Sequence, residues 1–307
     1  MVDDKELACN VLNIERYGTE DGPGIRTVVF LKGCKLRCKW CANPESQLFT
    51  SQILLKVETC VGCGRCKEVC PNNAIEFKEG YGYITNMDTC NLCGICVDSC
   101  YYSAREIMGI KYTEDSLLKE ILKDENYFKS TGGGVTFSGG EPLFQASLIR
   151  NIAIEMKKRG YNTLVETCGH VPLSNIKEIA DVVDYFYFDF KQIDPEKHKL
   201  LTGQTNELIL KNLEWLCENY HGQISVRYPF IPNCNSSNEE IIGFLKYVKN
   251  LPNIHEVVFL PYHRLGLPKY TGLGREYEMG NMVSLKIREI KYLVDLASDF
   301  GINAKIQ

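Results

Sequence analysis

Three groups of closely spaced cysteines are the residues of this chain best suited to chemistry. The first group, Cys34, Cys38 and Cys41, offers three thiolates, whereas a closed zinc or iron–sulfur site takes four protein ligands. A cubane cluster held by three thiolates keeps one iron open to an outside ligand. We therefore predict a [4Fe-4S] cluster that does chemistry as well as electron transfer. The alternative, a structural zinc site with a distant fourth ligand, fits the spacing poorly.

The other two groups follow the spacing of bacterial two-cluster ferredoxins. In that spacing the fourth cysteine of each run binds the cluster held mainly by the other run. We therefore predict two further [4Fe-4S] clusters, and three in all. The predicted ligands are Cys60, Cys63, Cys66 and Cys70, followed by Pro71, and then Cys90, Cys93, Cys96 and Cys100. The four remaining cysteines are interpreted as small core residues; these are Cys9, Cys168, Cys217 and Cys234.

Short apolar segments alternate with amphipathic ones through most of the chain, which predicts strands, helices and a parallel α/β sheet. Chemically capable residues stand where six of these strands end. Sites built from many strand ends are typical of barrels, whereas an open doubly wound sheet concentrates its site at one switch point. We therefore predict a partial (β/α)6 TIM-like barrel. The strand-end residues are Cys34, Ser138 to Glu141, Glu166 with Thr167, Asp189 to Lys191, Arg227, and Tyr262 with His263.

The region between residues 52 and 106 differs from the rest, since it is dense in cysteines and turns and carries little periodic pattern. A segment of this size buries too little apolar surface to be robust without additional links. We expect it to be a ferredoxin-like 2[4Fe-4S] insert. The barrel would then consist of residues 1–51 and 107–307.

Composition narrows the class of protein. A hydrophobic content of 44% and a charged content of 24% are those of an ordinary globular chain. A net charge of −4 gives no electrostatic basis for binding nucleic acid or an anionic membrane. The acidic segment from Met1 to Glu6 lacks a secretory apolar core, so we expect a cytoplasmic protein. Fifteen cysteines in a large intracellular chain indicate metal binding rather than disulfides.

Two of these motifs resemble signatures of the radical S-adenosylmethionine (SAM) superfamily. They are the three-cysteine loop with Trp40 before its last cysteine, and the Gly-Gly-Glu motif of Gly139, Gly140 and Glu141. The resemblance implies that the open iron chelates SAM and that one electron breaks its sulfur–carbon bond, giving methionine and a 5′-deoxyadenosyl radical. It also implies that Trp40 and the Gly-Gly-Glu residues contact the cofactor, because glycines let a backbone approach a ligand closely.

Further motifs resemble those of the glycyl-radical-enzyme activating enzymes. They are Tyr17 to Arg26, Asn43-Pro44-Glu45, Asp189-x-Lys191, and Leu260 to His263. Pyruvate formate-lyase activating enzyme is the minimal member of this family, and this chain is similar to longer members that carry a ferredoxin insert. The resemblance implies that Asp189, Lys191, Arg227 and His263 border SAM, with Lys191 among the catalytic residues, and that Glu166 with Thr167 binds a monovalent cation. Standing alone, each would be interpreted as an ordinary ion pair or core polar group.

The implied function is an activating enzyme that generates a glycyl radical on a partner glycyl radical enzyme. Its electron donor would be a protein such as flavodoxin or ferredoxin. The insert would relay electrons, or alternatively only support docking. Two other functions are compatible with the cysteines: a radical SAM enzyme acting on a small molecule or peptide, and a ferredoxin-type electron carrier. The carrier would need no Gly-Gly-Glu or Asp-x-Lys motif.

Overall fold

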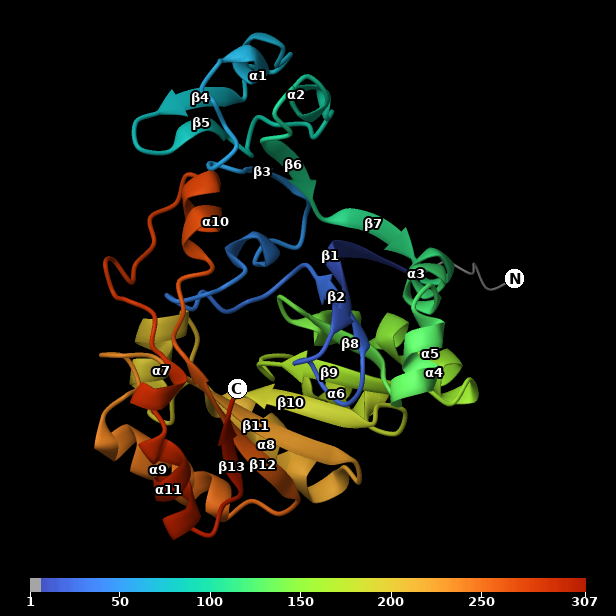
Figure 1. Ribbon diagram of the computed structural model, residues 1–307, viewed down its shortest axis with the longest axis vertical. Coiled ribbons are helices and arrows are strands. Elements are labelled where there is room, and N and C mark those ends of the chain that lie inside the picture. Colours follow the sequence, from blue (N-terminus) through green and yellow to red (C-terminus); the bar gives the residue numbers. More distant parts are fainter. Residues whose placement is uncertain (1–6) are drawn as a thin grey trace.

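A nine-stranded sheet organises the computed structural model, which describes residues 7–307 (Figure 1). The expectation about Met1 to Glu6 lies outside these residues. In spatial order the strands are β13 (Ala304–Ile306), β12 (Ile254–Pro261), β11 (Gln223–Phe230), β10 (Tyr185–Asp189), β9 (Asn162–Thr167), β8 (Gly134–Gly139), β2 (Arg26–Leu31), β1 (Ala8–Gly18) and β7 (Ile110–Thr113).

Most of this sheet is parallel. Every neighbouring pair from β2 through β8 to β13 is parallel, whereas β1 runs antiparallel to both β2 and β7. The strands from β8 to β13 lie in chain order, as expected when each strand returns beside the previous one through a crossover connection. The prediction of a parallel α/β sheet is therefore confirmed, and all carboxyl ends of its parallel strands meet at one edge.

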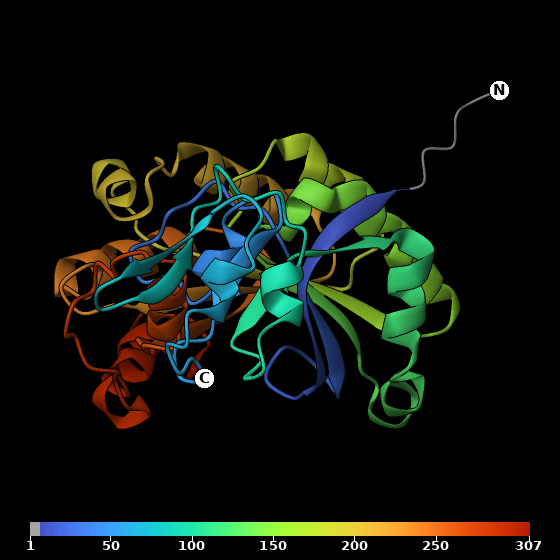
Figure 2. The same cartoon turned by 90° about the horizontal axis from the view of Figure 1, so that it is seen from above.

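Helices lie around the outside of the sheet, as the view from above shows (Figure 2). Local sequence fixes where several begin: Thr113 and Ser237 each form a capping box with the residue three positions later. The helices are α3 (Glu114–Leu122), α4 (Glu125–Thr131), α5 (Ala146–Lys158), α6 (Leu173–Ile179), α7 (Pro195–Thr202), α8 (Glu207–Asn219), α9 (Asn238–Lys249), α10 (Leu267–Gly272) and α11 (Tyr292–Asp299), with 3₁₀ helices η1 (Pro44–Ser46), η2 (Pro142–Gln145) and η3 (Ile287–Glu289).

The strand β10 illustrates how sequence decides which face each side chain occupies. Phe186 and Phe188 are fully buried, and the Phe186 ring packs edge-on against Tyr220 that follows α8. Because successive side chains of a strand point to opposite faces, Tyr187 and Asp189 are placed on the other face. The helices therefore cover the phenylalanines, and the opposite face carries the polar residues of the strand end.

The cysteine-rich segment stands apart from the sheet, at the top of Figure 1. Its elements are β3 (Gln52–Leu55) paired with β6 (Arg105–Met108), β4 (Ile75–Lys78) paired with β5 (Gly82–Thr85), and the short helices α1 (Arg65–Glu68) and α2 (Ile95–Asp98). It packs against α10, where Gly272 approaches Leu55 so closely that an added Cβ would lie 2.0 Å from the Leu55 carbonyl oxygen. None of the helices in residues 7–307 combines the length and apolarity that crossing a membrane requires.

Candidate active site

The loop that carries Cys34, Cys38 and Cys41 leaves the carboxyl end of β2 and is held by backbone hydrogen bonds. The amides of Arg37 and Lys39 donate to the carbonyls of Thr202 and Leu201 in α7, at 2.6 and 3.1 Å. These contacts extend the loop across the strand ends. As a result, all three thiols line a cavity of about 670 Å³.

This cavity brings together nearly every site residue predicted from the sequence. Its walls come from the ends of β8, β9, β10, β11 and β12, which agrees with a site assembled from several strand ends. The predicted residues that line it are Cys34, Cys38, Trp40, Cys41, Gly139, Gly140, Glu166, Asp189, Lys191, Arg227 and His263.

Among the described residues predicted for the Cys34 loop and the SAM site, Glu141 alone does not line the cavity. Its side chain is 1% exposed and is turned toward the loop after β9. There its carboxylate accepts hydrogen bonds from the Thr167 hydroxyl at 2.8 and 2.9 Å and from the Cys168 amide at 2.8 Å. The geometry therefore makes Glu141 a clamp between two strand ends rather than a cavity wall.

Charged side chains from three neighbouring strands form one network on the cavity wall. Arg227 pairs with Glu166, and its Nε lies 3.4 Å from Asp189. Lys191 pairs with the other oxygen of Asp189 at 2.9 Å, and the Ser138 hydroxyl donates to Glu166 at 2.5 Å. The register places Asp189 opposite Arg227 in adjacent strands, so the network follows directly from strand pairing.

Burial and neighbouring charges act in opposite directions within this network. Burial disfavours the charged form of Asp189, but Lys191 and Arg227 outweigh that effect and hold the pKa of Asp189 below its usual value. In the same way, Asp189 outweighs burial and raises the pKa of Lys191. All three groups are therefore charged at neutral pH. Burial lowers the pKa of His263, which leaves that imidazole neutral.

The thiols of the loop differ in their surroundings. Burial raises the pKa of Cys38 to about 12, and burial also raises the pKa of Cys41. Such thiols need a nearby positive charge to become thiolates, and a bound metal cluster supplies one. Three converging thiols with this need fit an iron–sulfur cluster well.

Cys168 is a fourth thiol in the same cavity, which the sequence did not reveal. Its interpretation as a small core residue agrees with its burial in the main core cluster, but Cys168 also lines the cavity and contacts Cys34, which lowers the pKa of Cys34. The Cys168 thiol itself donates to Glu141 at 3.0 Å. Contact with Cys34 and burial raise the pKa of Cys168.

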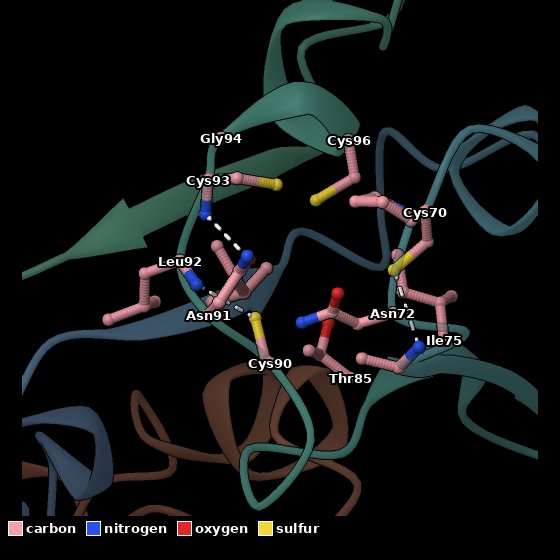
Figure 3. A pocket seen from close by; sticks show the side chains of 13 residues that line it. Cys70, Asn72, Ile75, Thr85, Cys90, Asn91, Leu92, Cys93, Gly94 and Cys96 are labelled. Carbon is pink, nitrogen blue, oxygen red and sulfur yellow. Dashed lines mark hydrogen bonds between the residues drawn. The ribbon is translucent and has the colours of Figure 1, made fainter.

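The eight cysteines of the insert surround two separate cavities, and each cavity takes its fourth cysteine from the other run. Figure 3 shows Cys70 facing Cys90, Cys93 and Cys96 across the first cavity. We call this the Cys90 site. The second cavity is lined by Cys60, Cys63, Cys66 and Cys100, and we call it the Cys60 site. This exchange is the arrangement that two-cluster ferredoxin spacing predicts.

The donor sets of the insert suit polynuclear clusters. Each insert site offers four thiols, the complete ligand set of a [4Fe-4S] cluster. Across residues 7–307, no three Cys, His, Asp or Glu side chains converge tightly enough for a single metal ion. The Arg105 guanidinium acts on Cys66 in the Cys60 site, where burial raises the pKa of Cys66 and Arg105 opposes this rise.

Comparison with protein families agrees with this geometry. Residues 90–245, about half of the chain, match the family described as the radical SAM superfamily. Residues 59–107 match a 4Fe-4S dicluster domain. The chain therefore belongs to the radical SAM superfamily and carries a dicluster domain.

Two relatives narrow the family. The choline trimethylamine-lyase activating enzyme of Oleidesulfovibrio alaskensis is 40% identical over 90% of both chains. The 4-hydroxyphenylacetate decarboxylase activating enzyme of Clostridioides difficile is 36% identical over 98% of this chain and 97% of its own. The chain belongs to the glycyl-radical-enzyme activating enzymes. Enzymes of this family cleave SAM and generate a glycyl radical on a partner enzyme, and this chain is an enzyme of that kind.

A solved structure supports the fold of this activating enzyme over most of its length. Streptococcus suis SuiB bound to precursor peptide SuiA has a TM-score of 0.55 and covers 91% of this chain and 48% of its own. At 11% identity the likeness concerns the fold alone. The relation to activating enzymes rests on the sequence relatives.

Sequence reasoning missed several residues around the Cys34 loop of the enzyme. Gln47 lines the cavity, is 2% exposed and leaves both side-chain polar atoms without a partner among the described residues. Tyr270 in α10 donates to the Cys38 carbonyl at 3.4 Å. Lys269 binds the Asn43 side chain at 2.7 Å. Of these contacts, the sequence pointed only to the Asn43-Pro44-Glu45 side. Residues of α10 lie more than 220 positions from the Cys34 loop, so no local pattern connects the two.

Proposed function

We propose that Cys34, Cys38 and Cys41 hold the catalytic [4Fe-4S] cluster of this activating enzyme and that the 670 Å³ cavity receives SAM. The main support for this proposal is that these three thiols line the same cavity as a network of charged side chains and two glycines at a strand end. When bound and reduced, a cluster with one iron lacking a protein ligand supplies the electron that cleaves the sulfur–carbon bond of SAM. The deoxyadenosyl radical then removes hydrogen from a glycine Cα of the partner.

The protein groups of the cavity have distinct proposed roles. Gly139 and Gly140 let the end of β8 pack closely on neighbouring backbone beside the cavity, since an added Cβ at either position would collide with Leu31 or Gly33 backbone at 2.4 to 2.6 Å. Lys191 and Arg227 are charged donors suited to the SAM carboxylate. Asp189 holds both cations in place and His263 offers a neutral imidazole to the nucleoside. Trp40 is 8% exposed and closes the side of the cavity nearest the thiols.

For the architecture we propose a partial (β/α)6 barrel formed by residues 1–51 and 107–307, with residues 52–106 as the insert. The six parallel strands that support this proposal are β2 and β8 to β12, with β13 as an added edge strand. Because β7 and β13 do not pair in the described part of the chain, the sheet is not closed into a full barrel and stays open along one side. A glycine loop of the partner would enter there.

The insert, in this proposal, holds two more [4Fe-4S] clusters and passes electrons from an external protein donor such as flavodoxin or ferredoxin. Support comes from its two sets of four thiols and from its contact with α10, which also touches the Cys34 loop. A monovalent cation beside Glu166 is the least supported member of the cofactor set. Both carboxylate oxygens of Glu166 already accept hydrogen bonds, one from Arg227 and one from Ser138.

The experiment that tests the function has two stages. Anaerobically prepared protein with dithionite and SAM should release 5′-deoxyadenosine, and C38A should abolish that release. Mixing the same protein with a candidate partner enzyme should then give a glycyl doublet in electron paramagnetic resonance. Full turnover by C38A would overturn the proposed site. Release of 5′-deoxyadenosine without a doublet on any glycyl radical enzyme would favour a small-molecule or peptide substrate.

A further inference from the structure

The two halves of the insert follow the same spacing but differ at one buried position. Arg105 stands five residues after Cys100, and Ile75 stands five residues after Cys70. The preceding residues behave alike, since the amides of Ala104 and Ala74 donate to the Cys100 and Cys70 sulfurs, both at 3.3 Å. The side chains that follow therefore occupy equivalent places beside the Cys60 site and the Cys90 site, which they line.

Arg105 is deeply buried for a charged residue. It is 3% exposed in β6, where it pairs with Leu55 of β3. One terminal nitrogen donates to the Tyr83 carbonyl at 2.7 Å, and the other donates to the Thr85 hydroxyl. These two contacts hold the guanidinium in place. Because both acceptors are neutral, neither balances its positive charge.

The guanidinium also faces a predicted cluster ligand. Its Nη1 lies 3.7 Å from the Cys66 sulfur, within reach of a weak hydrogen bond. Among residues 7–307, Arg105 has no carboxylate within 4.0 Å, and its Nε has no hydrogen-bond partner. The neighbouring Glu106 instead pairs with Lys56. A buried cation with no anionic partner is costly, and thiolates of the Cys60 site supply the missing negative charge.

No Lys or Arg is among the described residues that line the Cys90 site. Ile75 in the equivalent place is 2% exposed and apolar. A second difference points the same way: Arg65 lines the Cys60 site, and its counterpart in the other run is Ile95. Arg65 is exposed and stacks on Tyr101 at 4.5 Å, so water screens its charge more strongly than that of Arg105.

From this asymmetry we propose that Arg105 makes the Cys60 site the higher-potential member of the two insert clusters. A cluster gains one negative charge on reduction, and a nearby buried cation or hydrogen-bond donor stabilises that reduced state. A one-electron donor would be oxidised as the insert is reduced, and the electron would move from the Cys90 site to the Cys60 site without transfer of any atom. This inference deepens the proposed relay and rests on the insert holding two clusters.

Packing places the Cys60 site next to the route toward the Cys34 loop. Leu55 lines the Cys60 site, and its carbonyl touches Gly272 of α10. Leu55 also lines a cavity of about 410 Å³ whose wall includes Asn43 and Lys269, which line the active-site cavity as well. The Cys60 site is therefore connected to the Cys34 loop by packed residues of β3 and α10.

The test is a redox titration followed by electron paramagnetic resonance on the full chain without SAM or partner. A C34A/C38A/C41A background leaves only the insert clusters as signals. In R105M, we expect the higher midpoint potential to fall while the lower one stays. At the parent midpoint the oxidised-to-reduced ratio should rise by about tenfold, which is about 59 mV for one electron. R105K, which keeps the charge, should shift less than half as far.

R65M is the matched control, and its shift should be smaller than that of R105M because Arg65 is exposed. Unchanged midpoints in iron-replete R105M, or equal shifts in R105M and R105K, would overturn the proposal. If R105M loses iron, R105Q takes its place, and equal midpoints for R105Q and R105K would overturn it as well. An insert without two cluster signals would refute the relay itself, whereas failure to activate a partner leaves these midpoints interpretable.

Discussion

The carboxylate of Glu141 accepts hydrogen bonds from both the amide and the thiol of Cys168, at 2.8 and 3.0 Å. This contact joins the end of β8 to the loop after β9, beneath the cavity that holds the three thiols of the Cys34 loop. The glutamate of the Gly-Gly-Glu motif therefore holds the backbone after β9 in place beside the cavity. Two predictions follow from the roles of these two residues.

E141Q should destabilise the fold. The new amide group would face donors from Thr167 and Cys168, so buried hydrogen bonds would be lost. A buried polar group left unsatisfied costs about 1–3 kcal/mol. Anaerobic urea unfolding of the cluster-loaded protein measures this cost. E218Q on the exposed face of α8 is the control and should change the free energy of unfolding by less than about 0.5 kcal/mol; equal effects would contradict the clamp.

C168A should keep the catalytic cluster. The Cys168 thiol donates its one proton to Glu141 at 3.0 Å, so we expect it to be a neighbour of the cluster ligands and not one of them. We expect unchanged iron content and continued release of 5′-deoxyadenosine, whereas C38A should lose both the cluster and the release. Loss of one cluster's iron in C168A would mean that four thiols close the site, which would remove the open iron on which SAM binding depends.

The sequence predicted the site better than it predicted the helices around it. The cysteine spacing and the strand-end residues identified thirteen of the cavity-lining residues, because both depend on local pattern and on strand pairing. Apolar residues at helical spacing predict one helix over residues 113–128, but the structure divides this segment between α3 and α4. The break lies at Asp124, whose buried carboxylate accepts from Thr27 at 2.6 Å and Arg16 at 2.7 Å. Those partners lie about a hundred residues away, beyond any local pattern.

A second difference has the same origin. The sequence of residues 285–300 predicts one long helix, whereas the structure contains η3 and the shorter α11. The amide of Leu285 donates to the Tyr262 carbonyl at 2.8 Å, which ties the segment to the end of β12. Tertiary contacts therefore override helical periodicity here. The role of Cys168 escaped for the same reason, since only folding places it beside Cys34.

D189N should weaken SAM binding by about 10-fold, because Lys191 and Arg227 would lose the carboxylate that positions them. Isothermal titration of anaerobic protein measures the affinity, and exposed D299N is the control. The shifts move the pKa of Asp189 down and the pKa of Lys191 up, so neither group titrates near neutrality. The ratio of wild-type to D189N affinity should therefore stay constant from pH 6.5 to 9. A change in that ratio within the range would contradict the assigned charges.

G139A should disrupt the site far more than G160A. Both glycines have positive φ, at 112° and 80°, so both substitutions strain the backbone by about 1 kcal/mol. A Cβ at Gly139 would also lie 2.4 Å from the Leu31 amide nitrogen, whereas Gly160 has open space around it. We expect G160A to keep SAM affinity and G139A to lose it. Similar SAM affinities for G139A and G160A would contradict this expectation, because they would mean that the end of β8 can shift to accept a Cβ without changing the cavity.

C63S and C93S test whether the insert relays electrons or only supports docking. Cys63 and Cys93 are exposed thiols of the Cys60 site and the Cys90 site, so each substitution removes one predicted ligand from one cluster. With a protein donor such as flavodoxin, release of 5′-deoxyadenosine should fall by about 10-fold or more. With dithionite, a small reductant that reaches the active-site cavity directly, the rate should fall much less. C234A, outside all three cysteine groups, should match the parent with both reductants. Equal losses with both reductants would assign the insert a structural role, because a relay is needed only when the donor is too large to reach the catalytic cluster.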